Sequence, residues 1–436
     1  MLALFALLLP PPLFEASTLR GAHVSAYVIS AQTGKVLYAR DPDAAMMPAS
    51  TLKLVVGSSA LDELGTSFAF TTSLATDGTT LYLEGSGDPL LREGDFDDAA
   101  RALDALQLTT FTTLAGDAGS PLAGYPDGWE LDDLAYYYAA PPSPLSIDEN
   151  TVRIAVHPAA PGAQPSLSFT PATDAVKVVN DATTGPADSQ DTTNVQVALN
   201  DPDTLVLTGS VPADDADDAI DAAILDPARV ALDLIAQTLT RGGIHFAATA
   251  TLTAAPPNAR VLWTHHSPPL PDLLRAMWLP SNNLLAESLL DALAPTREEA
   301  LERERAWLQS IGIDPATTTL ADGSGLSAYD RITARDLVTI LAHDWNGPNR
   351  AVVMRALPIS GDRGTLKNKF TAPPLAGAVI AKTGTVNHTR TLAGFLQTPH
   401  GTLIFALMIN DWMDRGPKAT ADLRAFQSTF LESFFE

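Results

Sequence analysis

A serine and a lysine three residues apart form the first pair in the chain that could carry out nucleophilic catalysis. The segment 48–53 (PASTLK) leads into the apolar run 54–61, so a helix that opens near Ser50 would place Ser50 and Lys53 on one face. A serine hydroxyl needs a neighbouring base at neutral pH, and a lysine can be that base only where burial or another cation lowers its pKa. The apolar run offers this burial, and the free amides at the start of a helix could bind a developing oxyanion. The alternative is an ordinary N-capped helix, because S-x-x-K occurs by chance in many chains.

Two later motifs favour the catalytic interpretation. The segment 281–283 (SNN) stands at the start of a helical pattern, and the segment 382–385 (KTGT) follows the strand-like residues 377–381. The elements S-x-x-K, Ser-x-Asn and K-T-G, in this order, are the combined signature of penicillin-binding proteins and class A β-lactamases. Each motif is weak alone, whereas the three in order predict a serine acyl-transfer site.

Composition excludes several classes of partner. The chain has 436 residues, of which 46% are hydrophobic, as expected for a globular protein of two or three domains. Its formal charge of −24 would repel nucleic acid and anionic membrane surfaces. The absence of cysteine excludes disulfides and thiolate metal sites, and it fits an oxidising compartment. The eight histidines form no H-E-x-x-H pattern, so no metal and no cofactor are expected.

The N-terminal residues 1–16 resemble a secretory signal segment. An apolar run is followed by three prolines and small residues, although the usual positive charges are missing. We therefore expect an exported protein of the periplasm or cell envelope; the alternative is a buried N-terminal helix. The rest of the sequence contains no run of about eighteen apolar residues, so we expect no integral membrane span in the mature chain.

Residues from about 95 to 255 contain no nucleophile and base spaced as favourably as Ser50 and Lys53. We therefore interpret the long segment between Ser50 and Ser281 as an insertion into the catalytic domain. Residues 22–40 predict a β-hairpin that delivers the chain to Ser50. The C-terminal part predicts three adjacent antiparallel strands, closed by a terminal helix: 376–382, 390–397 and 402–410.

With these residues, the chain resembles the S13 family of serine peptidases, the type-C low-molecular-mass penicillin-binding proteins (D-alanyl-D-alanine carboxypeptidase/endopeptidases). The resemblance extends from about residue 20 to 432 and includes the further motifs 87–89 (GDP), 138–141 (YAAP) and 322–327 (DGSGLS). It implies a multi-domain α/β protein in which two nested, mostly β domains are inserted into a catalytic domain of the penicillin-binding transpeptidase/β-lactamase type. The expected parts are a catalytic domain of residues 17–68 plus 257–436, an inserted domain II of 69–150 plus 201–256, and a nested domain III of 151–200.

The resemblance also implies the catalytic roles. Ser50 attacks the D-Ala–D-Ala carbonyl or the β-lactam amide, with Lys53 as base. Ser281 relays the proton to the leaving amine, and Asn283 holds Lys53 and the substrate amide. The backbone N–H groups of Ser50 and Thr385 form the oxyanion hole.

Substrate contacts follow from the same resemblance. Lys382 and the Thr383 hydroxyl bind the terminal carboxylate, and Gly384 lets the substrate lie close to the strand. Asp133 stands where relatives hold the free ammonium of the stem-peptide diamine, and Tyr138 is expected in the same substrate site. The expected partners are thus peptidoglycan stem peptides and β-lactams.

One departure concerns the diamine. Relatives often carry an arginine directly after the Gly-Leu-Ser of the DGSGLS motif, where it meets the side-chain carboxylate of diaminopimelate; this chain has Ala328. We therefore expect a stem peptide with lysine or ornithine. The alternative functions are a β-lactamase, a non-catalytic peptidoglycan-binding homologue and an esterase of related fold.

Overall fold

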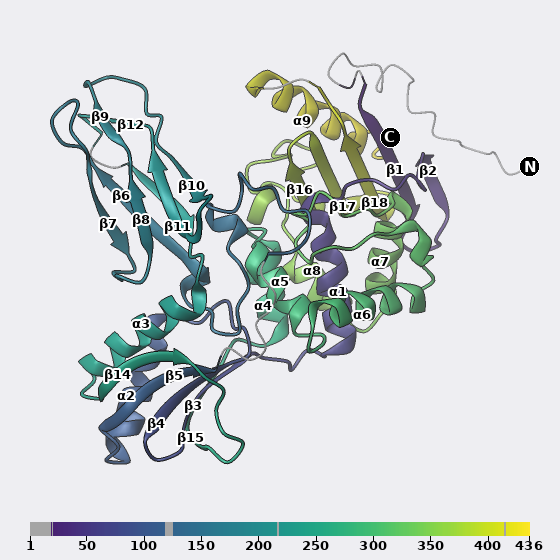
Figure 1. Cartoon of the computed structure of the whole chain (residues 1–436). Coiled ribbons are helices and arrows are strands. Elements are labelled where there is room, and N and C mark those ends of the chain that lie inside the picture. Colours follow the sequence, from purple (N-terminus) through teal and green to yellow (C-terminus); the bar gives the residue numbers. More distant parts are fainter. Residues whose placement is uncertain (1–18, 20, 118–124, 216–217, 414–415) are drawn as a thin grey trace, which may run out of the picture. The chain divides into compact units, whose positions relative to one another are not determined.

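The computed structural model describes residue 19 and residues 21–117, 125–215, 218–413 and 416–436. The chain divides into two compact units (Figure 1). The first comprises Met1–Phe68, Pro126–Gly128 and Pro269–Glu436, and the second Ala69–Tyr125 and Trp129–Pro268. The expected signal segment, residues 1–16, lies outside the described residues.

The first unit is built on a five-stranded antiparallel sheet of order β16-β17-β18-β1-β2. The strands are β1 (His23–Ser30), β2 (Val36–Arg40), β16 (Val379–Val386), β17 (Thr389–Thr398) and β18 (Gly401–Asn410). The N-terminal hairpin therefore pairs with the C-terminal strands, and both ends of the chain build one sheet. The expected β-hairpin and the three expected C-terminal strands are confirmed, but the first of these strands runs from 379 to 386 instead of 376 to 382, so the segment 382–385 lies within β16.

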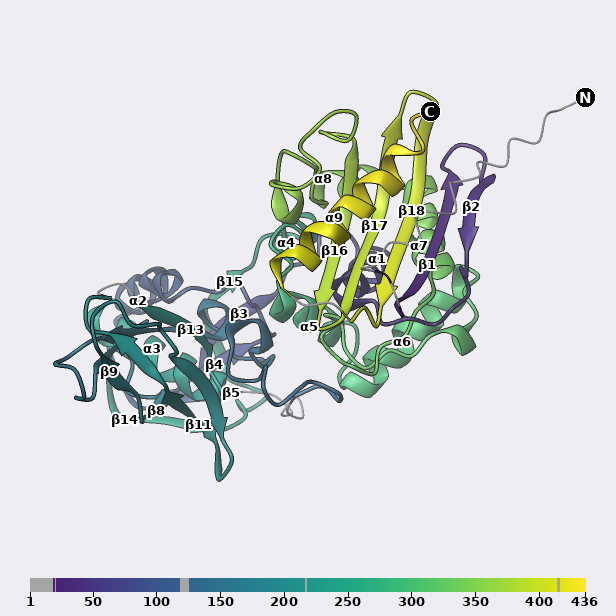
Figure 2. The same ribbon diagram turned by 90° about the horizontal axis from the view of Figure 1, so that it is seen from above.

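Helices cover both faces of this sheet. They are α1 (Lys53–Glu63), α4 (Leu270–Trp278), α5 (Asn283–Asp291), α6 (Arg297–Ser310), α7 (Ala334–Asn346), α8 (Arg350–Ala356) and α9 (Pro417–Glu432). Alternate residues of β18 pack under α9, which crosses one face (Figure 2). The buried partners on β18 and α9 are Leu403, Phe405, Leu407, Ile409, Leu423, Phe426 and Phe430. On the other face α7 contacts β1 and β18, and α1 packs against α5, α6 and α7.

The second unit contains a five-stranded mixed sheet of order β14-β5-β4-β3-β15 and several smaller sheets. The large sheet is built from β3 (Thr71–Thr76), β4 (Thr80–Gly85), β5 (Thr110–Asp117), β14 (His245–Leu252) and β15 (Arg260–His266), with α2 (Phe96–Ala105) and α3 (Pro227–Arg241). The smaller sheets use β6 (Thr151–His157), β7 (Ser166–Thr170), β8 (Lys177–Asn180), β9 (Thr183–Gly185), β10 (Asn194–Ala198), β11 (Asp201–Thr208), β12 (Ser210–Pro212) and β13 (Ala219–Ala223).

Two of the domain boundaries expected from the sequence differ from those that the strand pairing gives. Because β15 pairs with β3, the second unit continues to Pro268, beyond the expected boundary at residue 257. Because β11 pairs with β8 and β13 pairs with β6, the sheets that begin at residue 151 extend past residue 200. In both cases the partner strand lies far away in the sequence, where local patterns carry no information about it.

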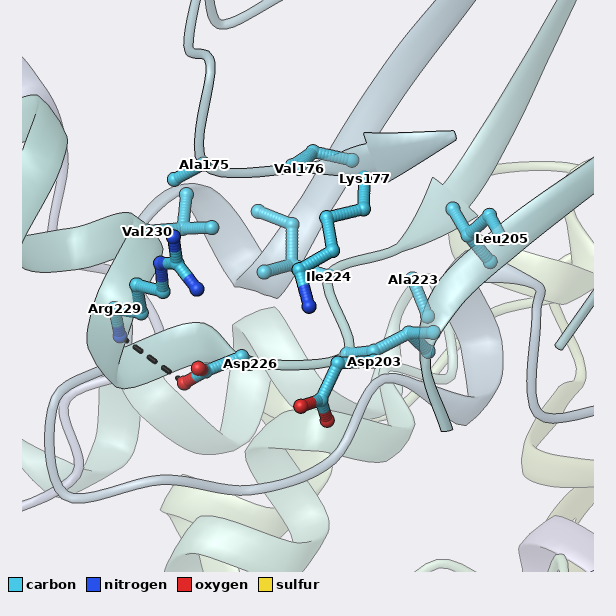
Figure 3. A pocket seen from close by; sticks show the side chains of 11 residues that line it. Ala175, Val176, Lys177, Asp203, Leu205, Ala223, Ile224, Asp226, Arg229 and Val230 are labelled. Atoms are coloured by element: carbon cyan, nitrogen blue, oxygen red, sulfur yellow. Dashed lines mark hydrogen bonds between the residues drawn. The ribbon is translucent and has the colours of Figure 1, made fainter. Parts of the chain in front are cut away.

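A small pocket lies in the second unit beside β8, β11 and the start of α3 (Figure 3). Charges of both signs line it, from Lys177, Asp203, Asp226 and Arg229. Asp226 caps α3 by accepting a 3.2 Å hydrogen bond from the Arg229 backbone N–H. None of the residues expected in catalysis or substrate binding lines this pocket. Among the described residues, no helix is both long and apolar enough to cross a membrane.

Candidate active site

The candidate nucleophile and base lie in direct contact at the start of α1. Ser50 belongs to a 3₁₀ turn (Ala49–Leu52), and Lys53 is the first residue of the helix that continues it. Lys53 Nζ lies 2.9 Å from Ser50 Oγ. The side chain of Lys53 is fully buried, and burial lowers its pKa to about 7 against the opposing charges of Asp322 and Glu287. A large fraction of Lys53 is therefore neutral near pH 7, which is the state that a general base requires.

Two further acceptors surround Lys53 Nζ. The Oδ1 atom of Asn283 and the carbonyl oxygen of Ser324 each lie 2.6 Å from it. A neutral amine has two N–H donors and one lone pair, and these two oxygens can only accept. When these two oxygens accept both N–H groups of the neutral amine, its lone pair faces the third neighbour, Ser50. The Ser50 hydroxyl is the only one of the three neighbours that can donate a proton to it. The arrangement therefore aims Lys53 at the Ser50 proton.

Long-range hydrogen bonds fix the segment before Ser50. The Pro48 carbonyl accepts from the hydroxyls of Thr51 and Thr391, at 2.7 and 2.6 Å. The Asn410 side chain binds both backbone groups of Met47. These bonds hold Ala49 at φ +48°, a left-handed conformation that is uncommon outside glycine and tends to occur at functional sites.

Ser281 and Lys382 form a second contact between side chains. Lys382 Nζ lies 2.8 Å from Ser281 Oγ and 2.7 Å from the Thr383 carbonyl oxygen. Burial, with the nearby charges of Lys53 and Lys369, holds the pKa of Lys382 well below its usual range. Ser281 itself has φ +69°, directly before the residue that caps α5. The Thr383 hydroxyl is bound to that of Thr365 at 2.8 Å.

Strand β16 presents backbone groups at the edge of the sheet. The Val379 carbonyl and the Ala381 N–H bind residues 358–360, so these groups point away from β17. Alternate residues of a strand point their N–H and C=O groups to the same edge, so those of Thr383 and Thr385 point to this edge as well. The Thr385 N–H therefore has the direction that an oxyanion donor or a bound extended peptide requires.

Gly384 allows β16 to pass close to the nucleophile segment. A Cβ atom at this position would lie 2.0 Å from Thr391 Oγ1 and 2.7 Å from the Pro48 carbonyl oxygen. No side chain fits there unless these groups move. The absence of a side chain at Gly384 thus sets the distance between the strand and residues 48–49.

Several residues that support the site were missed by the sequence analysis. Thr391 and Asn410 hold the backbone before Ser50, and Glu287 and Asp322 hold the loop that carries the Ser324 carbonyl. Only the motif 322–327 gave a signal, because the family resemblance includes it, and it did not predict a contact with Lys53.

Asp133 and Tyr138 lie in the second unit and bind each other. The Tyr138 hydroxyl donates to Asp133 Oδ1 at 2.8 Å, and Tyr136 stacks on the Tyr138 ring. Burial and this bond raise the pKa of Tyr138. Their assignment to substrate binding remains a prediction.

Comparisons with known proteins agree with this chemistry. The model of the D-Ala-D-Ala carboxypeptidase 3 (S13) family matches residues 13–430. The D-alanyl-D-alanine carboxypeptidase of Actinomadura sp. (strain R39) is 30% identical over 440 residues, which cover 94% of this chain and 82% of that protein. A Haemophilus influenzae carboxypeptidase, DacB, is 26% identical, with 84% of this chain and 81% of that protein covered.

Among solved structures, penicillin-binding protein 4 of Haemophilus influenzae superposes with a TM-score of 0.87 at 23% identity, covering 98% of this chain and 99% of that one. A predatory endopeptidase of Bdellovibrio bacteriovorus, solved in a penicillin G-acylated form, has a TM-score of 0.52 at 17% identity, with 94% and 93% covered. These two likenesses show the fold and confirm the expected multi-domain α/β class. The family match, which spans nearly the whole chain, confirms the expected family: the chain belongs to the D-Ala-D-Ala carboxypeptidase 3 (S13) family.

Proposed function

We propose that this chain is a serine-type D-alanyl-D-alanine carboxypeptidase that acts on peptidoglycan peptides through an acyl enzyme on Ser50. The contact that carries the proposal is the one between Lys53 Nζ and Ser50 Oγ, with the lone pair of neutral Lys53 turned toward the serine. Family membership supports the substrate class.

Acylation begins when Lys53 takes the proton of Ser50 and Oγ bonds to the carbonyl carbon of the penultimate D-alanine. The N–H groups of Ser50 and Thr385 stabilise the oxyanion, and loss of one such donor typically costs about 3 kcal/mol in acyl transfer. The C–N bond breaks as the proton that Lys53 took passes through Ser281 to the leaving amine, which leaves Lys53 neutral again. Lys382 holds Ser281 by the 2.8 Å hydrogen bond. Water then attacks the ester, with Lys53 again as base, and releases Ser50.

The terminal carboxylate of the substrate is assigned to Lys382 and Thr383, and the peptide backbone to the free edge of β16 beside Gly384. An extended peptide that adds to a sheet edge gains main-chain hydrogen bonds there. The same site accepts an internal D-alanyl cross-link in place of a terminal D-alanine, so an endopeptidase activity is included in the proposal. Because peptidoglycan lies outside the cytoplasm, the enzyme is assigned to the cell envelope.

Labelling with a fluorescent penicillin tests the proposal. A β-lactam should form a covalent adduct on Ser50 of the wild type, located by intact mass and peptide mapping, and Ser50→Ala should lack it. A folded wild type that forms no adduct would contradict the proposal and favour a non-catalytic peptidoglycan-binding protein. Rapid, sustained hydrolysis of the β-lactam, rather than trapping, would favour a β-lactamase.

A further inference from the structure

The Ser324 carbonyl oxygen accepts a 2.6 Å hydrogen bond from Lys53 Nζ, and the loop that carries it has no regular secondary structure to hold it. If the Ser324 peptide rotated, Lys53 would lose one of the two acceptor-only oxygens that orient its lone pair. The loop 322–327 therefore needs support of its own. It is packed from one side, because a Cβ atom on Gly325, which has φ +77°, would lie 2.0 Å from the Ala49 carbonyl oxygen.

Glu287 supplies the first part of this support from helix α5. Its Oε1 atom accepts hydrogen bonds from the backbone N–H groups of Gly323 and Ser324, at 3.1 and 2.8 Å. The other oxygen binds Arg297 Nη1 at 2.5 Å, and Arg297 also binds Asp291 on the same helix as Glu287. The Glu287 side chain is fully buried, and its carboxylate has no contact with Ser50 in the described hydrogen bonds.

Asp322 supplies the second part from within the loop. Its Oδ1 atom accepts the Gly325 N–H at 2.7 Å, and this N–H belongs to the same peptide group as the Ser324 carbonyl. Asp322 therefore holds one end of that peptide while Lys53 binds the other end. Its Oδ2 atom accepts from Leu326, Ser327 and the Ser324 hydroxyl.

We propose that Glu287 and Asp322 are positioning residues for the acylation step. Together they accept from five successive backbone N–H groups of the loop, so that the Ser324 carbonyl takes one N–H of Lys53. The lone pair of the neutral amine is thereby turned toward Ser50. Both side chains are fully buried, and we assign neither carboxylate a contact with substrate. The inference rests on the proposed function because it assigns Lys53 as the base.

The same carboxylates influence the charge of Lys53. The charged and titratable groups around Lys53 are Glu287 on α5, Asp322 and Asp330 in and after the loop, and Lys382 on β16. Burial, aided by Asp322, raises the pKa of Asp330 well above its usual range. Burial and then Asp322 raise the pKa of Glu287 to about 7, with Arg297 opposing the rise. Removing Asp322 takes away a charge that favours the protonated form of Lys53, and removing Glu287 does so only at a pH where Glu287 is ionised.

The experiment measures the rate of Ser50 acylation by benzylpenicillin from pH 5 to 9 in the wild type, Glu287→Gln and Asp322→Asn. Both variants should acylate about 10- to 100-fold more slowly at the pH optimum, because a displacement of about 1 Å at a catalytic group can cost 10²-fold. In Asp322→Asn the acidic limb of the profile should also move to lower pH, since the lost charge no longer raises the pKa of Lys53. In Glu287→Gln the limb should move less, because a carboxyl with a pKa of about 7 is largely protonated there. Mere loosening of the fold would reduce the labelled fraction without moving this limb.

Glu304→Gln is the matched control. Glu304 is also fully buried, but its described hydrogen bond is to Ser59 and it does not touch the loop. This variant should keep the wild-type rate and limb. If Glu287→Gln does not fold, Glu287→Asp replaces it: the shorter acid keeps the charge beside Arg297 but withdraws from the loop, so the rate should fall while the limb stays.

Folded variants that acylate at the wild-type rate would overturn the inference, as would a loss no larger than that of Glu304→Gln. A wild type that forms no Ser50 adduct would instead contradict the proposed function, whatever the variants do. The two failures are therefore distinguishable.

Discussion

Lys382 Nζ donates a 2.8 Å hydrogen bond to Ser281 Oγ across 101 residues of sequence. The contact joins the edge strand of the sheet to the residue that leads into α5. Since Lys382 Nζ donates, the Ser281 hydroxyl keeps its own proton to donate elsewhere. Lys382 is fully buried, burial lowers its pKa, and no described ion pair joins it to an acid. A bound carboxylate would therefore stabilise the ammonium form of Lys382.

The Lys382→Met variant should lose the preference for substrates with a free terminal carboxylate. A charge-assisted hydrogen bond contributes about 1.5–3 kcal/mol, so kcat/KM for a D-Ala-D-Ala peptide should fall about 10- to 100-fold. The matched peptide amide lacks the carboxylate, and its kcat/KM should change much less. An equal loss for both peptides would contradict carboxylate binding by Lys382.

The rate of acylation should rise with pH through about 7. The pKa of Lys53 is lowered to about 7 by burial, and only the neutral amine can accept the Ser50 proton, so the rate is low below this pH and reaches its plateau above it. The measurement is the rate constant of penicillin adduct formation between pH 5 and 9. A rate that stays constant over this range would exclude Lys53 as the base.

Gly384→Ala should block the approach of β16 to the nucleophile. The new methyl group would meet Thr391 Oγ1 and the Pro48 carbonyl, so we expect overpacking of about 1–3 kcal/mol and a loss of acylation. Gly94→Ala is the control, because nothing lies within 4 Å of a Cβ atom there. The two variants are compared by thermal unfolding and penicillin labelling. Full labelling of Gly384→Ala would show that the strand can move without cost.

The sequence identified the reacting residues better than their support, for a physical reason. Ser50 and Lys53 are three residues apart, so the helical period brings them together without further information. The Asn410 side chain binds Met47, which lies 363 residues away, and the Ser324 carbonyl is a backbone group that any residue type would carry. Such contacts depend on how distant elements pack, and one sequence does not encode them in a local pattern.

The contrast between local patterns and contacts of distant elements also explains why the expected domain boundaries differ from the observed ones. The pattern of β15 predicts a strand, but its membership of the second unit depends on pairing with β3. The three C-terminal strands were predictable because each pairs with its neighbour in the sequence through a short turn.

The stem-peptide diamine can be tested on matched pentapeptides. Ala328 has no charge with which to bind the side-chain carboxylate of diaminopimelate, so peptides with ornithine or lysine should be cleaved at least as well. The measurement is kcat/KM for the matched peptides. A preference for the diaminopimelate peptide would contradict the prediction and point to a cation elsewhere in the site.

Glu304 should make the protein less stable as the pH rises. Burial raises the pKa of Glu304 from 4.5 to about 8, so between these values the folded state holds a proton that the unfolded state releases. The free energy of unfolding therefore falls with increasing pH through this window, by on the order of 5 kcal/mol at about 1.4 kcal/mol per pKa unit. Glu304→Gln cannot ionise, so its thermal midpoint should exceed that of the wild type at pH 8.5 and differ less at pH 5. Glu302→Gln, on the exposed side of the same helix, is the control. A cost of ionisation is expected because the Ser59 hydroxyl, at 3.3 Å, is the one hydrogen-bond donor described for the buried Glu304 carboxyl. If Glu304→Gln followed the wild type at both pH values, the carboxyl would ionise without cost and the prediction would be wrong.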